Sequence, residues 1–215
     1  MDVVLDNRDL FLSGMRTTVS LTLLSFAIAL VIGTVVAGFR VSPVPPLRAV
    51  GAFYVATVRN TPLAVLMILF FSGFPDAGII VDSRYVSAII VLSAYTGAFV
   101  GETVRAGVNA VSRGQGEAAR AIGLTFPQVL TLVVLPQAVR TVVAPLGSIF
   151  IALIKNSSLA ALISVAELAG NAEQLITSEA QPIPIFLGAA VCYLALTIPS
   201  GFAVAWLERK VAIKR

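Results

Sequence analysis

The feature that most constrains this chain is an uncharged stretch of 20 residues, from Val19 to Gly38. At a rise of about 1.5 Å per residue, a helix of that length is roughly 30 Å long, which matches the hydrocarbon thickness of a bilayer. Only 12% of the 215 residues are charged, whereas globular domains carry about 25% charged residues. The sequence therefore predicts an all-α integral membrane protein.

Further apolar stretches follow, so that a single transmembrane domain of five helices is predicted over residues 1–215. The expected spans cover residues 19–39, 50–74, 85–106, 138–155 and 184–207. A proline-rich turn at residues 40–48 cannot be helical throughout. Pro145 and Gly147 indicate a kink in the fourth span.

The distribution of cations predicts the orientation of the spans, because cytoplasmic loops carry an excess of Lys and Arg. With the N-terminus outside and the C-terminus in the cytoplasm, the inner segments hold ten cations and the outer segments four. The longest polar interval, residues 111–136, then lies on the cytoplasmic side. The N-terminus is acidic, so we expect an outward-facing tail rather than a cleaved signal peptide.

Composition excludes several classes of site. The chain has no histidine, which rules out His-based triads and imidazole metal sites, and we expect neither a metal nor a cofactor. The single Cys192 cannot form an internal disulfide and is interpreted as a packing residue. No G-x-x-x-x-G-K-[ST] phosphate loop is present, so any ATP hydrolysis must occur on another chain and this chain is not expected to be an enzyme. The net charge of +4 does not indicate nucleic acid, because the cations lie at span ends.

The polar interval at residues 111–136 is predicted to form two short helices. The capping-box spacing S/T-x-x-Q occurs twice, at Ser112 with Gln115 and at Thr125 with Gln128. Gly123 is expected to end the first helix, because glycine adopts the left-handed conformation of helix ends without strain. From spacing alone, an ordinary solvated loop is an equally good interpretation.

Four residues of this interval, Glu117, Ala118, Ala119 and Gly123, followed by Leu135-Pro136, resemble the EAA loop of ABC importer permeases. The wider run from about Thr57 to Leu168 resembles polar amino acid permeases of the histidine, glutamate and glutamine type. Two positions depart from the family's pattern: Val133 stands where isoleucine is usual, and Asn60 where glycine is common. The resemblance implies the ABC type I importer permease fold.

In that family the EAA loop docks into a cleft of the ATPase and transmits its closure. The resemblance therefore implies that Glu117, Ala118, Ala119 and Gly123 couple this chain to an ATPase. Alanine and glycine allow close approach of a partner, while the carboxylate can meet basic or N–H groups. We also expect Glu117 in the first turn of its helix, where an acid is stabilising.

The implied function is the membrane-spanning permease subunit of a bacterial ABC importer for a polar amino acid, with glutamate or a close relative favoured. The implied partners are two ATPase subunits, a second identical or related permease subunit, an extracytoplasmic binding protein, the amino acid and the lipid bilayer of the plasma membrane. An ion-gradient carrier without an ATPase is the alternative, and a membrane anchor without a pathway is a third possibility.

Polar breaks within spans are the candidate substrate sites, since polar groups in a bilayer are costly unless they line protein or water. The first break is Arg59, Asn60 and Thr61, where the guanidinium could pair a substrate carboxylate. Alternatively, Arg59 extends to the inner headgroups and Leu63 starts a short helix.

The second break is Lys155, Asn156, Ser157 and Ser158. Here span four is expected to stop and restart, so that a serine-capped helix N-terminus could hold an anion. The alternative is the outer end of the span at the interface. Glu102 and Arg105, three residues apart on one helix face, are predicted to be a structural ion pair or a gate pair.

Overall fold

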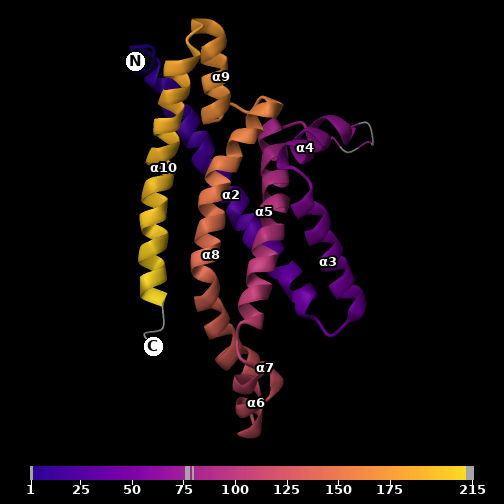
Figure 1. The fold of residues 1–215 in the computed structure, drawn as a ribbon. Helices are drawn as coiled ribbons and strands as arrows, with labels where there is room; N and C mark the ends of the chain where they lie inside the picture. The colour runs from indigo at the N-terminus through magenta and orange to yellow at the C-terminus, as the bar shows by residue number, and fades with distance from the viewer. Residues whose placement is uncertain (1, 76–77, 79, 212–215) are drawn as a thin grey trace.

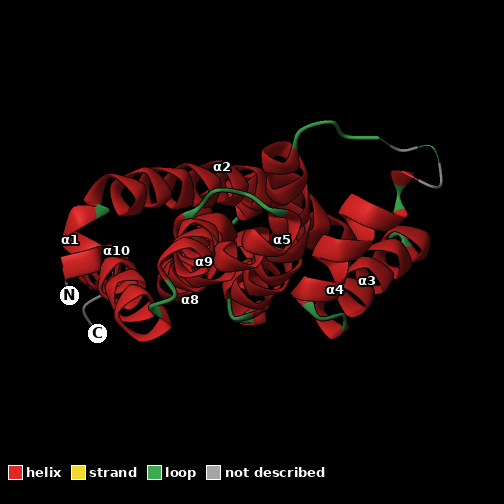
Figure 2. Ribbon diagram, turned by 90° about the horizontal axis from the view of Figure 1, so that it is seen from above, coloured by secondary structure: helices red, strands yellow, loops and turns green. Residues whose placement is uncertain are grey.

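The computed structural model describes residues 2–75, 78 and 80–211, and every regular element in this part of the chain is a helix (Figures 1 and 2). The long helices are α2 (Arg8–Val41), α5 (Arg84–Asn109), α8 (Leu135–Asn156) and α10 (Pro182–Val211). The shorter α-helices are α1 (Asp2–Asp6), α3 (Pro45–Asn60), α4 (Leu63–Ile68), α6 (Arg113–Ala121), α7 (Phe126–Gln128) and α9 (Leu168–Glu179). Two π-helical turns, η1 (Leu69–Gly73) and η3 (Val129–Val134), and a 3₁₀ helix, η4 (Ser157–Ile163), are also present among the described residues.

Four helical segments of the described residues are long and apolar enough to cross a membrane. They are α2, α5, the helix from Phe126 to Ile163 that contains α8, and α10. A fifth crossing is formed if α3 and the α4–η1 segment are taken together. The predicted all-helical, multi-span architecture is therefore confirmed.

The second predicted span, residues 50–74, is not one straight helix. Its two halves are bent by 103° at the break, and α4 turns across the upper end of α5 in Figure 1. Thr61 is extended, with φ −99° and ψ 130°, because the residue before a proline is disfavoured in the helical region. The polar break thus lies where the sequence indicated, and Leu63 begins a new short helix.

The connection between α2 and α3 is shorter than expected. Only residues 42–44 of the predicted turn at 40–48 are non-helical. Pro45 and Pro46 occupy the first turn of α3, where a missing N–H removes no helical hydrogen bond.

Helices α2 and α5 lie side by side at the centre of the fold, and small residues let them approach. A Cβ built on Gly33 of α2 would overlap the Val100 side chain of α5. A Cβ on Gly101 of α5 would lie 3.1 Å from Val36 Cγ1. Small residues at such crossings allow the close backbone approach on which packing between membrane helices depends.

The predicted cytoplasmic interval at residues 111–136 is only partly a loop. Its first helix, α6, is separate, but its second continues through α7 and η3 into α8, and Phe126 to Ile163 is one helical segment of 38 residues. The prediction of two short helices is therefore wrong for the second one. Figure 1 shows α6 and α7 at the lower tip, at the opposite end of the molecule from α9.

Candidate functional site

The end of α6 is fixed by Gly123, as predicted. Gly123 has φ +94°, its N–H donates to the carbonyl of Arg120 at 3.0 Å, and the N–H of Leu124 donates to the carbonyl of Ala119 at 3.1 Å. These two bonds form a Schellman motif, which satisfies the last carbonyls of the helix. The α6 helix therefore ends abruptly and reverses toward α7.

The start of α6 differs from the prediction. The Ser112 hydroxyl makes no capping hydrogen bond, and the N–H of Gln115 donates to the Ser112 carbonyl instead, at 3.0 Å. The predicted capping box at Ser112 is therefore wrong. The α6 helix begins at Arg113, so Glu117 is its fifth residue and lies beyond the first turn in which we expected it.

The second capping box, at Thr125 with Gln128, is present, as predicted. The Gln128 side-chain oxygen accepts the Thr125 N–H at 2.9 Å and the Thr125 hydroxyl at 3.0 Å. A hydroxyl that donates can also accept, and the reciprocal contact from the backbone N–H of Gln128 to the Thr125 side chain is present as well. The start of α7 is therefore anchored to its own first turn.

The outward face of α6 combines an acid with small and apolar side chains. Glu117, Ala118 and Gly123 are exposed, whereas Ala119 is buried because α6 packs against η3. Ile122 is 80% exposed and Phe126, just beyond the turn, is 73% exposed. Glu117, Ala118, Ile122 and Phe126 are called the α6 face below. Sequence reasoning missed Phe126, although an aromatic residue within a polar interval was a usable signal.

At the first polar break only one side chain is directed away from its own helix. Asn60 donates to the carbonyl of Ala56 and Thr61 to that of Thr57, both at 2.8 Å. The Arg59 guanidinium lies 5.0 Å from the centroid of the Phe99 ring, a cation–π contact between α3 and α5. The neighbouring amide and hydroxyl groups are thus satisfied within α3, and Arg59 is exposed.

The second predicted break, at residues 155–158, is absent. The helix runs on from α8 into η4, so no new helix N-terminus is presented. Ser157 donates to the carbonyl of Ile154 and Ser158 to that of Lys155, both at 2.8 Å. These local bonds satisfy the hydroxyl groups inside a helix, so a serine pair does not need a break. The predicted serine cap is therefore wrong, and Lys155 is an exposed cation at the end of α8.

The predicted pair of Glu102 and Arg105 is confirmed and has a third member. Arg105 Nε donates to Glu102 Oε1 at 3.1 Å, and Arg40 Nη1 lies 3.1 Å from Glu102 Oε2. Arg40 comes from α2, so the cluster ties α2 to α5 at the end nearer α6. Sequence spacing could find the pair within one helix but not the partner 62 residues away.

A fully buried carboxylate, Glu167, was not singled out from the sequence. It is 0% exposed and accepts hydrogen bonds from Thr18 Oγ1 at 3.2 Å, Tyr193 Oη at 2.8 Å and the N–H of Gly170 at 2.8 Å. The Gly170 bond caps the start of α9, where an acid is favoured. Glu167 therefore joins α2, α9 and α10 at one point.

The electrostatics of Glu167 reflect two opposing effects. Burial, the larger one, raises the pKa of its carboxyl, while the donors at Gly170, Tyr193, Ala169 and Thr18 act to lower it. Desolvation disfavours the charged form and hydrogen bonds favour it. The residue lies in the connection between η4 and α9, outside the helices that cross the membrane.

Residues 29–213 match the family described as binding-protein-dependent transport system inner membrane components. The chain belongs to this family. It is 34% identical over 211 residues to the probable glutamine ABC transporter permease protein GlnM of Bacillus subtilis, covering 98% of this chain and 97% of that protein. It is 37% identical to the glutamate transport system permease protein GluC of Corynebacterium efficiens, covering 92% of each.

The similarity of the fold to a solved structure agrees with the family match. The fold is similar to a solved chain of an amino acid ABC transporter with histidines, with a TM-score of 0.91, 28% sequence identity and coverage of 96% of both chains. The predicted all-α permease fold of an ABC importer is confirmed. The protein is thus a multi-pass membrane permease subunit of an ABC transporter, a transport component whose ATPase activity is on separate subunits.

Proposed function

We propose that this permease subunit imports a polar amino acid, with glutamate or a close relative as the substrate, and that the α6 face receives the closing motion of an ATPase. The amino acid class is supported by relatives described as glutamine and glutamate permeases. The observation that carries the coupling role is the α6 face itself. In this face Ile122 is 80% exposed and Phe126 is 73% exposed. Helices α6 and α7 lie at one tip of the molecule (Figure 1).

An exposed pair of large apolar side chains beside small residues is typical of a protein interface. Ala118 lets a partner approach the α6 backbone closely, and Glu117 beside it offers a carboxylate to basic or N–H groups. The abrupt end at Gly123 holds α6 in a fixed direction relative to η3 and α8. A push on α6 is therefore passed to the membrane-crossing helix that contains α8.

The excess of cations at the α6 end supports the orientation proposed for the chain, with the N-terminus outside and the C-terminus in the cytoplasm. In the proposed assembly, two permease subunits enclose the pathway, two ATPases contact the α6 faces and an extracytoplasmic binding protein delivers the amino acid. ATP-driven closure of the ATPases then switches the spans from inward-open to outward-open.

For the pathway, we propose the two polar segments at residues 59–61 and 155–158. Arg59 and Lys155 supply the positive charge that a substrate carboxylate needs. The side chains of Asn60, Thr61, Ser157 and Ser158 donate to their own helices, so they and Asn156 are proposed to shape the pathway around the two cations. Glu102 and Arg105 are proposed as a structural ion pair, with a gate pair as the alternative.

The coupling role is tested by uptake of labelled glutamate in cells carrying Glu117→Arg. A cation placed on the α6 face should reduce uptake about tenfold or more at normal protein level. Glu173→Arg is the matched control, because Glu173 is also an exposed acid but lies on α9 at the opposite end. Unchanged uptake in Glu117→Arg at normal abundance would count against the coupling role.

The substrate is tested separately with the reconstituted complex. Unlabelled glutamate, aspartate, glutamine and histidine are compared as competitors for uptake of labelled glutamate. Strongest competition by glutamate or aspartate supports the acidic substrate, whereas stronger competition by histidine overturns it. Flux without ATP in vesicles containing the permease alone would instead support the ion-gradient carrier.

A further inference from the structure

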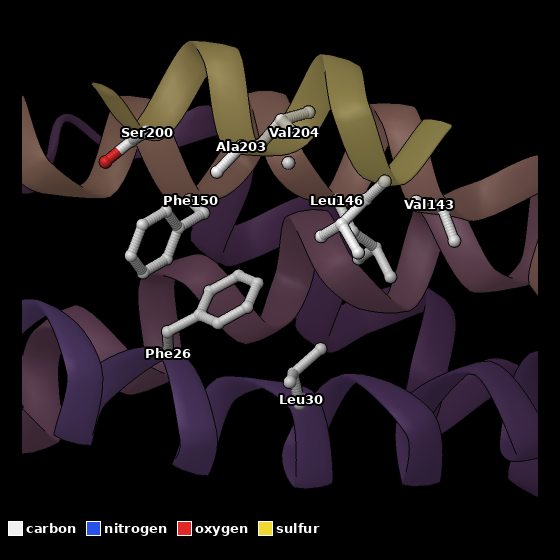
Figure 3. A pocket seen from close by; sticks show the side chains of 10 residues that line it. Phe26, Leu30, Val143, Leu146, Phe150, Ser200, Ala203 and Val204 are labelled. Carbon is white, nitrogen blue, oxygen red and sulfur yellow. The ribbon is translucent and has the colours of Figure 1, made fainter. Parts of the chain in front are cut away.

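An apolar cavity, open on one side, lies between α2, α8 and α10, away from the α6 face. It has a volume of about 350 Å³, and Figure 3 shows Phe26 and Leu30 of α2 opposite Ala203 and Val204 of α10. The lining residues are Phe26, Leu30, Val143, Leu146, Gly147, Phe150, Ser200, Ala203, Val204 and Leu207. We call this space the acyl cavity.

The chemistry of the acyl cavity excludes a polar ligand. Its single lining side chain with a polar atom is Ser200, whose hydroxyl already donates to the carbonyl of Leu196 at 2.7 Å. An amino acid in this space would lose the hydration of both its charges and gain no compensating partners. An apolar surface of this kind favours apolar occupants.

The two ends of the acyl cavity differ. Phe26 and Phe150 form an edge-to-face pair, with ring centroids 5.1 Å apart, at the end farther from α6. Val143 and Leu207 line the end nearer α6, and the rise of α8 from Val143 to Phe150 gives a length of roughly 10 Å. A linear apolar chain entering at the α6 end would therefore stop against the aromatic pair.

Two exposed cations lie about one helical turn beyond the lining residues, one on each of α8 and α10. Arg140 precedes Val143 by three residues on α8, and Lys210 follows Leu207 by three residues on α10, so each lies about one turn beyond the lining on a neighbouring face. Both are exposed. In the described part of the chain the salt bridges are those of Glu102, so neither cation is paired with a carboxylate.

The residues at the end of the acyl cavity nearer α6 are typical of the headgroup region of a membrane. Lys210 Nζ lies 4.0 Å from the centroid of the Trp206 ring, and tryptophan and lysine are typical of the membrane–water interface. Basic residues between helices on the cytoplasmic side are suited to anionic lipid headgroups.

We propose that the acyl cavity holds the headgroup-proximal part of one acyl chain of an anionic phospholipid, with the lipid phosphate at the Arg140 and Lys210 end and the rest of the chain leaving through the open side into the bilayer. The lipid comes from the leaflet on the α6 side, which is the cytoplasmic leaflet in the orientation proposed above. The chain fills the space between α2, α8 and α10, where protein atoms do not meet. The phosphate neutralises cations that have no carboxylate partner among the described residues.

The experiment uses the full-length permease, copurified with its partners and delipidated in detergent, and titrated with phosphatidylglycerol or phosphatidylcholine in native mass spectrometry. One phosphatidylglycerol should bind about 25-fold more tightly than phosphatidylcholine, since each of the two cations near the headgroup contributes about fivefold. Equal binding of the two lipids overturns the proposal.

Two pairs of variants locate the site. Ala203→Leu fills the acyl cavity and should abolish the tight phosphatidylglycerol site. Ala205→Leu, two residues away on the other face of α10, should not. The double variant Arg140→Gln/Lys210→Gln should weaken the site about tenfold or more, whereas Arg113→Gln/Arg209→Gln, with the same loss of charge, should leave it intact.

A second copy of this chain is the competing occupant of the same surface. If Ala203→Leu disrupts the permease pair and leaves phosphatidylglycerol binding unchanged, the proposal is overturned in favour of an interface. The double cation variant changes only exposed side chains, so it tests the lipid even if Ala203→Leu does not fold. Equal loss of binding in the tested and control double variants also overturns it.

Discussion

The hydroxyl of Tyr193 on α10 donates a 2.8 Å hydrogen bond to Oε2 of Glu167, the residue that caps α9. The same oxygen accepts a bond from Thr18 on α2. Helix α2, which is far away in the sequence, therefore meets the neighbouring helices α9 and α10 at one buried carboxylate. This end of the chain is held by a polar centre, whereas small residues allow the close approach of α2 and α5 where they cross.

Replacing Glu167 with glutamine should destabilise the protein by about 1–3 kcal/mol. The amide retains one acceptor but brings an N–H₂ group toward donors that already point at it, so buried polar groups are left without partners. Glu167→Ala should cost more, because it leaves Thr18, Tyr193 and the Gly170 N–H unsatisfied. Thermal unfolding in detergent measures the effect.

Glu173→Gln provides the control for that measurement, since Glu173 lies on α9, the helix that Glu167 caps, but is exposed. The thermal unfolding midpoint of Glu173→Gln should equal that of the wild type. Tyr193→Phe removes a single donor, so its loss of stability should be about 1 kcal/mol, between those of Glu173→Gln and Glu167→Gln. If Glu167→Gln melts with the wild type, the polar centre does not stabilise this end of the fold.

The contribution of Glu167 should also depend on pH. Burial raises the pKa of this carboxyl in the folded state, so the folded state binds the proton more tightly than the unfolded state. The stabilisation is present below the unfolded pKa of about 4.3 and is lost as pH rises through the higher folded value. The free energy of unfolding of the wild type, measured relative to that of Glu167→Gln, should therefore fall as pH is raised from 4 and then become constant. A relative free energy of unfolding that rises with pH contradicts this prediction.

Apolar length was enough to predict most of the fold from the sequence. The predicted spans at 19–39 and 85–106 fall within α2 and α5, because an uncharged helix of that length has few other stable environments. The break at Thr61-Pro62 was also predictable, since proline restricts the residue before it. These features depend on local chemistry that the sequence displays directly.

The remaining features depend on partners that the sequence does not display. The break predicted at residues 155–158 is absent because two serine hydroxyls donate to carbonyls three residues back. Glu167 resembled a solvated acid, and its donor Thr18 is 149 residues away. Hydropathy and motif spacing therefore located the spans and α6 but could not indicate which polar groups meet.

The contact between α2 and α5 can be tested at Gly33. A Cβ at this position would overlap Val100 and lie 2.8 Å from the backbone nitrogen of Gly101, so Gly33→Ala should destabilise the chain by about 1–3 kcal/mol. Gly38→Ala is the control in the same helix, because an added Cβ there meets nothing within 4 Å. The fraction of monodisperse protein after detergent extraction measures the difference. Equal yields for the two variants would contradict the close contact.

The end of α6 depends on the backbone of Gly123 rather than on its surroundings. With φ at +94° and no atom within 4 Å of an added Cβ, the cost of a substitution is conformational. Gly123→Val should lower uptake more than Gly123→Asn, because asparagine tolerates positive φ better than a β-branched residue does. Gly114→Ala, where the Cβ meets only Ser112 Oγ at 3.7 Å, should retain uptake. An order in which valine is tolerated as well as asparagine would show that this turn does not position α6.

The cluster of Arg40, Glu102 and Arg105 permits a test between a structural pair and a gate. These side chains are partly exposed, so each ion pair should contribute only about 0–1 kcal/mol. Arg40→Gln leaves Glu102 paired with Arg105, whereas Glu102→Gln removes the charge from both contacts. If the cluster is structural, both variants should keep uptake, and the small losses in unfolding midpoint should be larger for Glu102→Gln.

If the cluster is a gate, uptake should change while the unfolding midpoint does not. A double-mutant cycle between Arg40 and Glu102, read once as uptake and once as stability, separates the two cases. We expect coupling in stability and none in uptake, because the 3.1 Å contact from Arg40 to Glu102 joins α2 to α5 within the subunit. Coupling in uptake alone would assign the cluster to the transport cycle, and the structural interpretation of Glu102 and Arg105 would be wrong.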